Sequence, residues 1–300
     1  MKKNHIKYLI TGSSGWIAKS FLAKLKLLYS DDFENIVLPL SSKNHNLCLN
    51  KNLIKTFKYN HNFDQNFEYH LIHLGYPSKN VILELGAENF ENQCIKNREF
   101  IEYFCNNYKV KSLIFSSSGT VYTQTDQYAK NKIFDEEYLQ NLAKKHNLNL
   151  LITRIFNIGG PYVNKPENFA LYNFLLQARS HKNIRIEAKN DIYRSFVHLE
   201  NLSDFFYCWL NDHNKNSHEI LDICTDKSIE LKDLAKKIIK IFNLNCEIIS
   251  PNYNIENHPE FYIGNAKKYY DFMQKYQIKI HDLNKIITDS NDYLNIISKL

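Results

Sequence analysis

A glycine-rich turn lies near the start of the chain, between a short apolar run and a stretch with helical periodicity. Residues 6–10 read Ile-Lys-Tyr-Leu-Ile, and residues 11–18 read Thr-Gly-Ser-Ser-Gly-Trp-Ile-Ala. Glycine permits a tight turn and a close approach of the backbone to a pyrophosphate, and the helix start that follows offers N–H groups. The pattern therefore predicts a strand–turn–helix unit that binds a dinucleotide, with these candidate ligands: Gly12, Ser14, Gly15, Trp16 and Ile17.

Strand-like and helix-like segments alternate through the first half of the chain. We expect strands at 6–10, 35–40, near 53–59, 70–74, 112–115 and 148–155. We expect helices at 16–29, 87–108 and 128–146. This alternation predicts an α/β fold with a doubly wound parallel sheet of the Rossmann type, and a ligand at the carboxyl ends of its strands.

The pattern changes after about residue 160. Helical segments are expected at 169–179, 199–210 and 231–242, with strands at 183–187 and 219–224. We interpret residues 1–160 as a dinucleotide-binding domain to which parts of 190–225 return. Residues 161–300 would then form mainly a smaller α/β lobe that binds the substrate.

Composition restricts the class of protein. The 300 residues are 44% hydrophobic, which supports a sizeable core, and the net charge of +6 comes from dispersed lysines. A dispersed charge argues against a nucleic-acid partner. The sequence has no run of about 18 apolar residues, so we also expect no membrane partner. The six cysteines form no C-x-x-C pair and no cluster with zinc spacing, so we expect no metal site and reduced cysteines in a cytoplasmic protein.

The end of the second expected strand bears on the choice of cofactor. An NAD site usually has an acidic residue about 20 residues after the glycines, where it holds the ribose 2′-hydroxyl. Here the chain has Ser41, Ser42 and Lys43 and no carboxylate. Two hydroxyls and an ammonium suit a 2′-phosphate, so the sequence favours NADP(H), with NAD(H) as the alternative.

A possible catalytic group follows the expected strand at 112–115. Ser116, Ser117 and Ser118 come directly after it, and Tyr128 and Lys132 are spaced four apart at the start of the next helix. Residues four apart lie on one helix face, and an ammonium near a phenol lowers the pKa of the phenol. A serine hydroxyl can hold a carbonyl oxygen while the tyrosine passes it a proton. This pattern indicates hydride chemistry at a sugar or alcohol carbon.

Together these motifs resemble the extended short-chain dehydrogenases/reductases, the nucleotide-sugar epimerase/dehydratase family. Residues 11–18 are similar to the family's T-G-x-x-G-x-x-G/A, with Ala18 in place of the last glycine. Residues 70–74 resemble its V-I-H-L-A, residues 115–122 its S-S-x-x-V-Y, and Tyr128 with Lys132 its Y-x-x-x-K. Residues 154–157 are similar to its R-x-F-N, and residues 194–198 to its R-D-F-V-H.

The resemblance implies a role for each matching residue. Ser118 would hold the substrate oxygen, Tyr128 would be the acid/base, and Lys132 would hold the nicotinamide ribose and tune Tyr128. Leu74 and Gly75 would border the cofactor. A nucleotide-diphosphate sugar would meet the remaining candidates, of which the last two would hold its diphosphate: Tyr76, Gly119, Thr120, Asn157 and Arg194.

Departures from the family pattern reduce the number of reactions that the resemblance allows. Gly119 and Thr120 stand where the family's dehydratases have an Asp-Glu pair, and where some epimerase–reductases have a cysteine, so hydride chemistry alone remains. The loop between Ser118 and Tyr128 is short, and Leu74-Gly75-Tyr76 replaces the usual Ala-Ala after the histidine. Our first hypothesis is an NADPH-dependent 4-ketoreductase of a nucleotide-linked 4-keto-6-deoxy sugar. An NAD-dependent C4 epimerase is the second, and a catalytically silent binding protein on the same fold is the third.

The resemblance also implies a homodimer. In this family, the helices that correspond to residues 87–106 and 128–146 often form a four-helix interface. The apolar residues available for it are Phe100, Ile101, Phe104, Leu139 and Leu142. The same residues would equally serve to pack these helices on the sheet.

Overall fold

The computed structural model describes residues 6–42, 46–50, 52–180, 182–213, 218–251 and 258–298. The chain divides into two compact units. The first comprises Met1–Arg154 and Ser203–Leu221, and the second comprises Ile155–Leu202 and Asp222–Leu300. The chain therefore leaves the first unit and returns to it once before it ends in the second.

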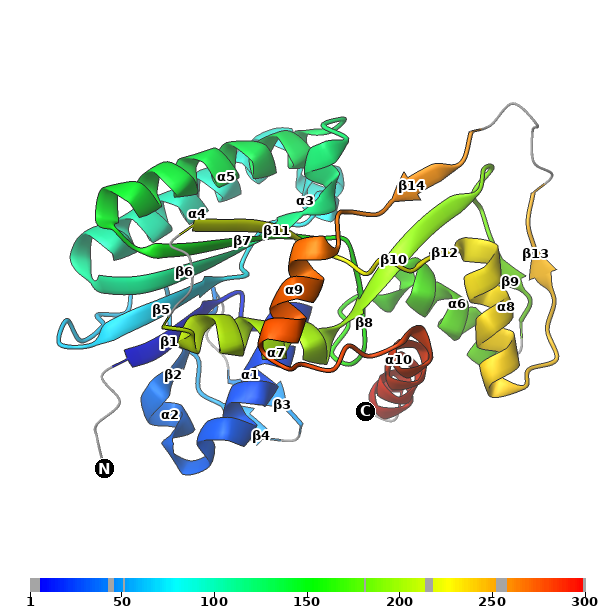
Figure 1. Cartoon of the computed structure of the whole chain (residues 1–300), viewed down its shortest axis with the longest axis horizontal. Coiled ribbons are helices and arrows are strands. Elements are labelled where there is room, and N and C mark those ends of the chain that lie inside the picture. Colours follow the sequence, from blue (N-terminus) through cyan, green and yellow to red (C-terminus); the bar gives the residue numbers. More distant parts are fainter. Residues whose placement is uncertain are drawn as a thin grey trace. The chain divides into compact units, whose positions relative to one another are not determined.

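A six-stranded sheet organises the first unit (Figure 1). Its strand order is β11-β7-β6-β5-β1-β2, and the pairings β2–β1, β1–β5 and β5–β6 are parallel. The strands are β1 (Ile6–Thr11), β2 (Val37–Pro39), β5 (Glu68–His73), β6 (Lys109–Ser118), β7 (Asn149–Ile155) and β11 (His218–Ile223). This arrangement is the doubly wound Rossmann-type α/β sheet that the alternation of segments predicts.

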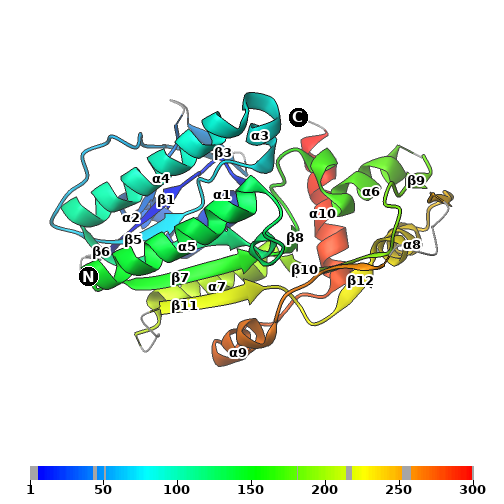
Figure 2. The ribbon, with the colours of Figure 1, turned by 90° about the horizontal axis from the view of Figure 1, so that it is seen from above.

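Helices cover both faces of this sheet, with α4 and α5 on one face and α1 on the other (Figures 1 and 2). The helices of the unit are α1 (Trp16–Tyr29), α2 (Phe33–Ile36), α3 (Lys79–Leu85), α4 (Ala87–Asn107), α5 (Gln127–His146) and most of α7 (Leu199–Asn211). α7 lies beside α1, where Ser203 bonds Ser20 at 2.8 Å and Asp204 pairs with Lys24 at 2.7 Å. The returning segment is thus part of the first unit's helical layer.

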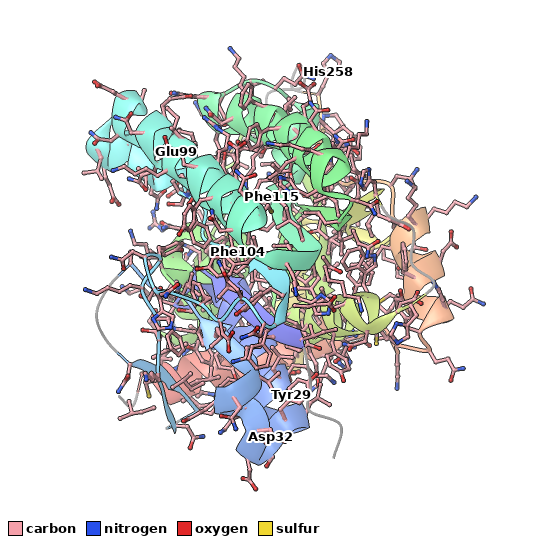
Figure 3. All side chains as sticks on the ribbon, turned by 90° about the vertical axis from the view of Figure 1, so that its left-hand side faces the viewer. Tyr29, Asp32, Glu99, Phe104, Phe115 and His258 are labelled. Carbon is pink, nitrogen blue, oxygen red and sulfur yellow. The ribbon has the colours of Figure 1, made fainter. Side chains whose placement is uncertain are left out.

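The core between α4, α5 and the sheet is apolar and rich in aromatic rings. Phe104 of α4 and Phe115 of β6 belong to it and are both fully buried (Figure 3). Phe104 contacts Tyr69 and Tyr108 with ring centroids 5.3 and 4.6 Å apart. Buried rings of this size contribute much of the apolar area that a single core can remove from water.

The carboxyl ends of β1 and β5 meet where the strand order reverses. β2 pairs with one side of β1 and β5 with the other, so the turn after β1 and the turn after β5 lie side by side. In doubly wound sheets this switch point is where a ligand binds. The first unit therefore has its glycine turn at the position that the fold reserves for a cofactor.

Several elements differ from their predicted form. Residues 35 and 36 end the short helix α2, so β2 begins only at Val37. The strand expected near 53–59 is replaced by a hairpin of β3 (Leu47–Leu49) and β4 (Asn52–Ile54), and by a single parallel bridge between Leu40 and Phe57. The helix α3 was not predicted, because it has no buried residue and hence no apolar face that would reveal it.

Among the described residues, the second unit contains a small mixed sheet and four longer helices of its own. The sheet follows the order β12-β10-β14, with β8 on β10, and β9 pairs separately with β13. Its strands are β8 (Asn157–Gly159), β9 (Ile184–Arg185), β10 (Ile192–His198), β12 (Ser228–Glu230), β13 (Ile248–Ile249) and β14 (Glu260–Tyr262). Its longer helices are α6 (Ala170–Arg179), α8 (Leu231–Phe242), α9 (Lys267–Lys275) and α10 (Leu283–Ile297). β10, α9 and α10 were not predicted as elements from the sequence.

Within the described part of the chain, no helix has the length and apolar character needed to cross a lipid bilayer. All six cysteines are free, and three of them are buried: Cys94, Cys105 and Cys224.

Candidate active site

The turn after β1 makes direct backbone contact with the turn after β5. Gly12 has φ +64°, and a Cβ atom at this position would lie 2.5 Å from Cα of Gly75 and 2.6 Å from its nitrogen. Neither contact can be relieved by a side-chain rotation, because both atoms belong to the backbone. Gly12 is therefore required both by its left-handed conformation and by the approach of Gly75.

Hydrogen bonds hold this pair of turns together. Thr11 Oγ1 accepts from the backbone N–H groups of Leu74 and Gly75, both at 3.1 Å, and lies 3.0 Å from Nδ1 of His73. Tyr59 Oη accepts from the Gly12 N–H at 3.4 Å. Burial, with the nearby ammonium of Lys132 as a smaller cause, lowers the pKa of His73 to about 3. A neutral imidazole is thus built into the floor of the site.

The start of α1 lies where the sequence predicts the phosphate-binding residues. Gly15 is its N-cap, and Trp16 and Ala18 are buried in its first turn. Ser13 Oγ is buried and has no hydrogen-bond partner among the described residues. A helix start with available N–H groups beside a buried hydroxyl that lacks a partner fits an anionic group, such as the pyrophosphate of a dinucleotide. Trp16, another predicted cofactor ligand, is buried in this turn.

Ser118 is the last residue of β6 and is buried at the carboxyl end of the sheet. Its Oγ accepts from the backbone N–H of Thr120 at 3.3 Å and from the Thr120 hydroxyl at 3.0 Å. These two bonds fix the oxygen at the start of a short 3-10 helix, Gly119–Tyr122. A serine hydroxyl can donate one hydrogen bond as well as accept, and donation is the role that a carbonyl oxygen needs.

Tyr128 lies in the first turn of α5 and is half-buried. Asp126 caps this helix by accepting from the Ala129 N–H at 2.8 Å, and it also forms an ion pair of 2.6 Å with Lys79. The Lys79 ammonium lies 5.5 Å from the centroid of the Tyr128 ring, and Phe90 packs beside the same ring. The position of the phenol is therefore fixed by the helix cap and by two neighbouring helices, α3 and α4.

Lys132 lies one turn further along α5 and is almost fully buried, at 1% exposure. Its Nζ donates to the backbone oxygen of Ser116 at 2.6 Å. Burial lowers the pKa of Lys132 to about 7, although the carboxylates of Asp135 and Glu136 act in the opposite direction. The Nζ lies 5.7 Å from the Tyr128 ring centroid, so the two residues of the Y-x-x-x-K pair are neighbours in the first unit.

Two buried ion pairs anchor α5 next to this pair of residues. Asp135 accepts from Arg98 of α4 at 2.6 Å, and its side chain is only 4% exposed. Glu136 accepts a bidentate bond from Arg154 of β7, the shortest contact being 2.6 Å, and a further bond from Ser117 at 2.5 Å. Arg154, the arginine of the R-x-F-N motif, thus holds α5 in place, and its hydrogen bonds to Glu136 raise the pKa of the Arg154 guanidinium.

The end of β2 has no carboxylate. Leu40 and Ser41 are buried, and Ser41 donates its backbone N–H to Phe57 at 2.9 Å. Ser42 is exposed. Lys43, the third residue of the proposed 2′-phosphate group, lies outside the described residues.

Two predicted diphosphate ligands belong to the second unit. The Asn157 amide donates to the backbone oxygen of Ser195 at 3.1 Å. Arg194 pairs with Glu260 at 2.9 Å and stacks over Tyr262, with 5.0 Å between the guanidinium carbon and the ring centroid. Its Nη1 is buried and has no hydrogen-bond partner among the described residues. One nitrogen of the guanidinium is therefore committed to a carboxylate, while another has no acceptor among the described residues.

A pocket of about 470 Å³ in the second unit contains none of the predicted site residues. Its lining combines apolar side chains such as Phe196 and Leu283 with the ammonium groups of Lys227 and Lys237. Tyr270 borders it, but its hydroxyl already bonds Asp226 at 2.6 Å. The chemistry of the glycine turn, Tyr128 and Lys132 lies elsewhere in the chain.

Sequence reasoning missed three of the residues that surround Lys132. Cys94 and Arg98 of α4 and Asp135 of α5 come together there with Tyr76, which follows β5 and which the resemblance proposed only for the sugar. The one available signal was the position of Asp135, which is three residues after Lys132 and thus on nearly the same helix face. Nothing in a single sequence shows that Arg98 and Tyr76 would meet it.

A doubly wound sheet with a glycine turn at its switch point and a Ser, Tyr and Lys at its carboxyl edge defines a dinucleotide-dependent enzyme of the short-chain dehydrogenase/reductase type. Residues 8–224 match the model of the NAD dependent epimerase/dehydratase family. The chain belongs to this family.

Individual relatives are similar over much or nearly all of the chain. A UDP-glucose 4-epimerase of Mycoplasma genitalium is 26% identical over 239 residues, which is 68% of each chain. The structure of a UDP-glucuronic acid 4-epimerase of Bacillus cereus superposes with a TM-score of 0.76 at 15% identity, covering 97% of this chain and 99% of that one. A UDP-glucose 4-epimerase of Thermus thermophilus, solved with NAD, superposes with a TM-score of 0.73 at 17% identity, covering 96% and 99%. At these identities the structural likeness establishes the fold alone.

Proposed function

We propose that this protein is an NAD-dependent C4 epimerase of a nucleotide-diphosphate sugar. The observation that carries the proposal is Lys132, a nearly fully buried amine one helical turn from Tyr128, at the edge of the sheet where Ser118 ends β6. The absence of a carboxylic acid at Gly119 and Thr120 supports hydride chemistry without elimination of water. The relatives named above, all 4-epimerases, also support this choice over reduction.

The residues of the first unit fit a dinucleotide. Gly12 and Gly75 bring the two turns into backbone contact at the switch point of the sheet, and the buried Ser13 hydroxyl has no hydrogen-bond partner among the described residues. The residues that would hold the pyrophosphate side are Gly12, Ser14, Gly15, Trp16 and Ile17, and Leu74 and Gly75 would border the nicotinamide side. When bound, the dinucleotide supplies the acceptor and donor of hydride.

Side chains of the protein would transfer the proton of the C4 hydroxyl. Tyr128 would take the proton of the C4 hydroxyl as the carbon is oxidised and would return it after the keto sugar has exposed its other face. Ser118 would donate to the C4 oxygen and hold it in place. The ammonium form of Lys132 would lower the pKa of Tyr128 and so favour the phenolate that accepts the proton. A positioned acid/base of this kind contributes about 10²–10⁴-fold to the rate.

Asn157 and Arg194 would hold the diphosphate of the substrate, with Tyr76, Gly119 and Thr120 near the sugar. The buried Nη1 of Arg194 supports the phosphate role, since a guanidinium binds phosphate through two parallel donors. The proposed ligand is a nucleotide-diphosphate sugar, and UDP-sugars are the first candidates because the solved relatives hold them.

The test begins with the cofactor that the purified protein carries. Freshly prepared protein is denatured, and the released dinucleotide is identified by mass and stoichiometry. About one NAD per chain, together with interconversion of UDP-glucose and UDP-galactose or of another C4 pair, supports the epimerase. A protein that binds neither dinucleotide contradicts the proposal and favours a silent binding role on the same fold.

A 4-ketoreductase that uses NADPH is the second candidate. It is favoured by the end of β2, where Ser41 and Ser42 stand in place of a carboxylate. Replacing Ser42 and Lys43 by Ala should then weaken NADPH binding far more than NADH binding in titrations followed by fluorescence. Equal effects on the two cofactors would remove this reason for preferring NADP(H).

We also propose a homodimer formed by α4 and α5. Ile101, Phe104, Leu139 and Leu142 belong to the core of the first unit, and Phe100 packs against that core, so these residues serve the sheet. Three other apolar residues of these helices are exposed and would contact the partner subunit instead: Ile95, Tyr103 and Phe134.

A further inference from the structure

The ring of Tyr76 covers the ammonium of Lys132. Lys132 Nζ lies 3.2 Å from the Tyr76 ring centroid, and 4.5 Å from that of Phe115. Together with the bond to the Ser116 carbonyl, these rings enclose a cation that is 1% exposed. An ammonium at this distance from an aromatic face is stabilised by the ring quadrupole, most strongly where water is excluded.

The other end of Tyr76 is tied to a carboxylate. Its hydroxyl donates to Asp135 Oδ2 at 2.6 Å, and Asp135 Oδ1 accepts from Arg98 at 2.6 Å. Cys94 Sγ donates to the Tyr76 oxygen at 3.4 Å. A phenol that donates to a carboxylate becomes richer in electrons, and this strengthens its attraction for a cation on its face. Asp135 and Tyr76 therefore act on Lys132 through a single side chain.

Tyr76 also contacts the other member of the Y-x-x-x-K pair. Its ring meets Tyr128 edge-on, with centroids 5.8 Å apart and an interplanar angle of 90°. The small residue that the family usually has at this position could make neither contact. The presence of a tyrosine at position 76, in place of a small residue, thus connects Tyr128 and Lys132 to α4.

We infer that Tyr76 is a positioning residue, which presets the Tyr128–Lys132 pair and, through its ring and its bond to Asp135, sets the protonation of Lys132. The inference rests on the proposed function only for the roles of Tyr128 and Lys132, because the contacts themselves involve no ligand. The charged and titratable groups around Lys132 are these: Asp135 and Glu136 of α5, Cys94 and Arg98 of α4, Tyr76 and His73 of the β5 region, and Tyr128. Of these, Tyr76 contacts Nζ most closely through its ring face.

Two substitutions separate the parts of Tyr76. Tyr76→Phe keeps the ring and the burial but removes the bond to Asp135, whose carboxylate then loses charge stabilisation. Tyr76→Leu keeps an apolar cover but removes the aromatic face. A buried ammonium without a compensating ring favours its neutral form, so the pKa of Lys132 should fall by about one pH unit in Tyr76→Leu. In Tyr76→Phe the ring remains but is no longer made electron-rich by the bond to Asp135, so the pKa of Lys132 should fall by less.

The pKa of Lys132 can be measured in the ligand-free protein. The free energy of unfolding is recorded from pH 5 to pH 10 for each variant with and without Lys132→Met, and the difference curve isolates the titration of Lys132. Tyr138→Phe is the matched control, because Tyr138 lies on α5 and donates to Glu102 at 2.7 Å away from Lys132. A lower titration midpoint for folded-state Lys132 in Tyr76→Phe and Tyr76→Leu, but not in Tyr138→Phe, supports the inference. An unmoved midpoint in Tyr76→Phe overturns it, even if Tyr76→Leu does not fold.

Activity provides the second measurement. The pH profile of kcat for C4 epimerisation should shift in Tyr76→Phe in the same direction as the pKa of Lys132. A fall in kcat at all pH values with an unshifted profile would indicate a purely structural residue and overturn the inference. A protein without epimerase activity in which Lys132 still follows Tyr76 would contradict the proposed function and leave the preset of Lys132 supported.

Discussion

Gly75 and Tyr59 show how a departure from a family pattern can have a steric cause. A Cβ atom at Gly75 would lie 2.9 Å from the Gly12 nitrogen and 2.9 Å from the Tyr59 hydroxyl. The alanine that is usual at this position would therefore push apart the two turns that the dinucleotide site needs. At the residue scale, the loss of one methyl group makes room for a tyrosine hydroxyl at the glycine turn.

Gly12→Ala tests the close approach of the two turns. The new Cβ would meet the Gly75 backbone at 2.5 Å, and its φ of +64° is unfavourable for alanine, so we expect a loss of roughly 1–3 kcal/mol in the free energy of unfolding. Dinucleotide binding should be lost as well. Chemical denaturation and cofactor titration measure the two effects, and Gly86→Ala, where nothing lies within 4 Å of the new Cβ, is the control for a strained φ alone.

Tyr128→Phe tests the proton donor. Removal of the hydroxyl should lower turnover about 10²–10⁴-fold, because the C4 oxygen loses its acid/base. Dinucleotide affinity should remain within a few-fold of the wild-type value, since the ring still packs against Phe90 and Tyr76. Steady-state rates and a binding isotherm are compared on the same preparation; near-normal turnover would refute the role of Tyr128.

His73 makes the stability of the protein sensitive to acid. Its pKa is about 3 in the folded protein, below the ordinary value of 6.5, so the unfolded chain binds the extra proton between these two values. The contribution of His73 to stability is therefore complete above about pH 6.5 and is lost as the pH falls toward 3. In His73→Gln, unfolding free energies measured from pH 7 to pH 4 should fall less steeply than in the wild type; parallel curves would contradict this assignment.

At the element scale, α5 is the element on which the proposed chemistry depends. Its N-cap Asp126 sets where the helix begins, and the ion pairs of Asp135 and Glu136 fix it to α4 and β7. Two neighbouring carboxylates thus face two different arginines, one on each side of the helix. These contacts hold α5, and therefore determine the positions of Tyr128 and Lys132.

Glu136→Gln tests the anchoring of α5. Breaking a buried ion pair leaves the Arg154 guanidinium without its counter-charge, and we expect a loss of roughly 3 kcal/mol in the free energy of unfolding. The side chains of Asp233 and Lys236 are both exposed, so Asp233→Asn should leave the free energy of unfolding nearly unchanged. Urea denaturation of both variants compares them, and similar small losses would show that the buried pair does not anchor the helix.

At the scale of the whole molecule, the two units interleave in sequence. The chain completes most of the first sheet by Arg154, begins the second unit, and returns with residues 203–221 to supply most of α7 and of the edge strand β11. The first unit is therefore incomplete until the chain has reached Leu221 of its 300 residues. We expect a fragment that ends near residue 154 to lack this edge strand and helix.

Phe134→Asp tests the proposed dimer. Phe134 is 54% exposed on α5, where the guanidinium of Arg98 stacks on it, so a charge there should disrupt a partner surface and leave the fold intact. Size-exclusion chromatography with light scattering should show a dimer for the wild type and a monomer for the variant. A monomeric wild type would refute the proposal directly.

The sequence alone determined the local elements that follow from short-range pattern. The strand, glycine turn and helix of residues 6–29 and the helix that carries Tyr128 and Lys132 could be predicted, because apolar periodicity and glycine conformation act within a few residues. The fold class followed from their alternation. The homologous family could be named for the same reason, since its motifs are local.

Only the tertiary structure decided what surrounds those motifs. β10 was missed because its residues lack strict alternation, and its pairing partners β8, β12 and β14 come from three distant segments. The contact of Tyr76 with Lys132, the ion pair of Arg98 with Asp135 and the approach of Gly12 to Gly75 likewise join residues 37 to 63 positions apart. Such contacts depend on which strands become neighbours, and that choice is made by the burial of the whole sheet rather than by any local preference.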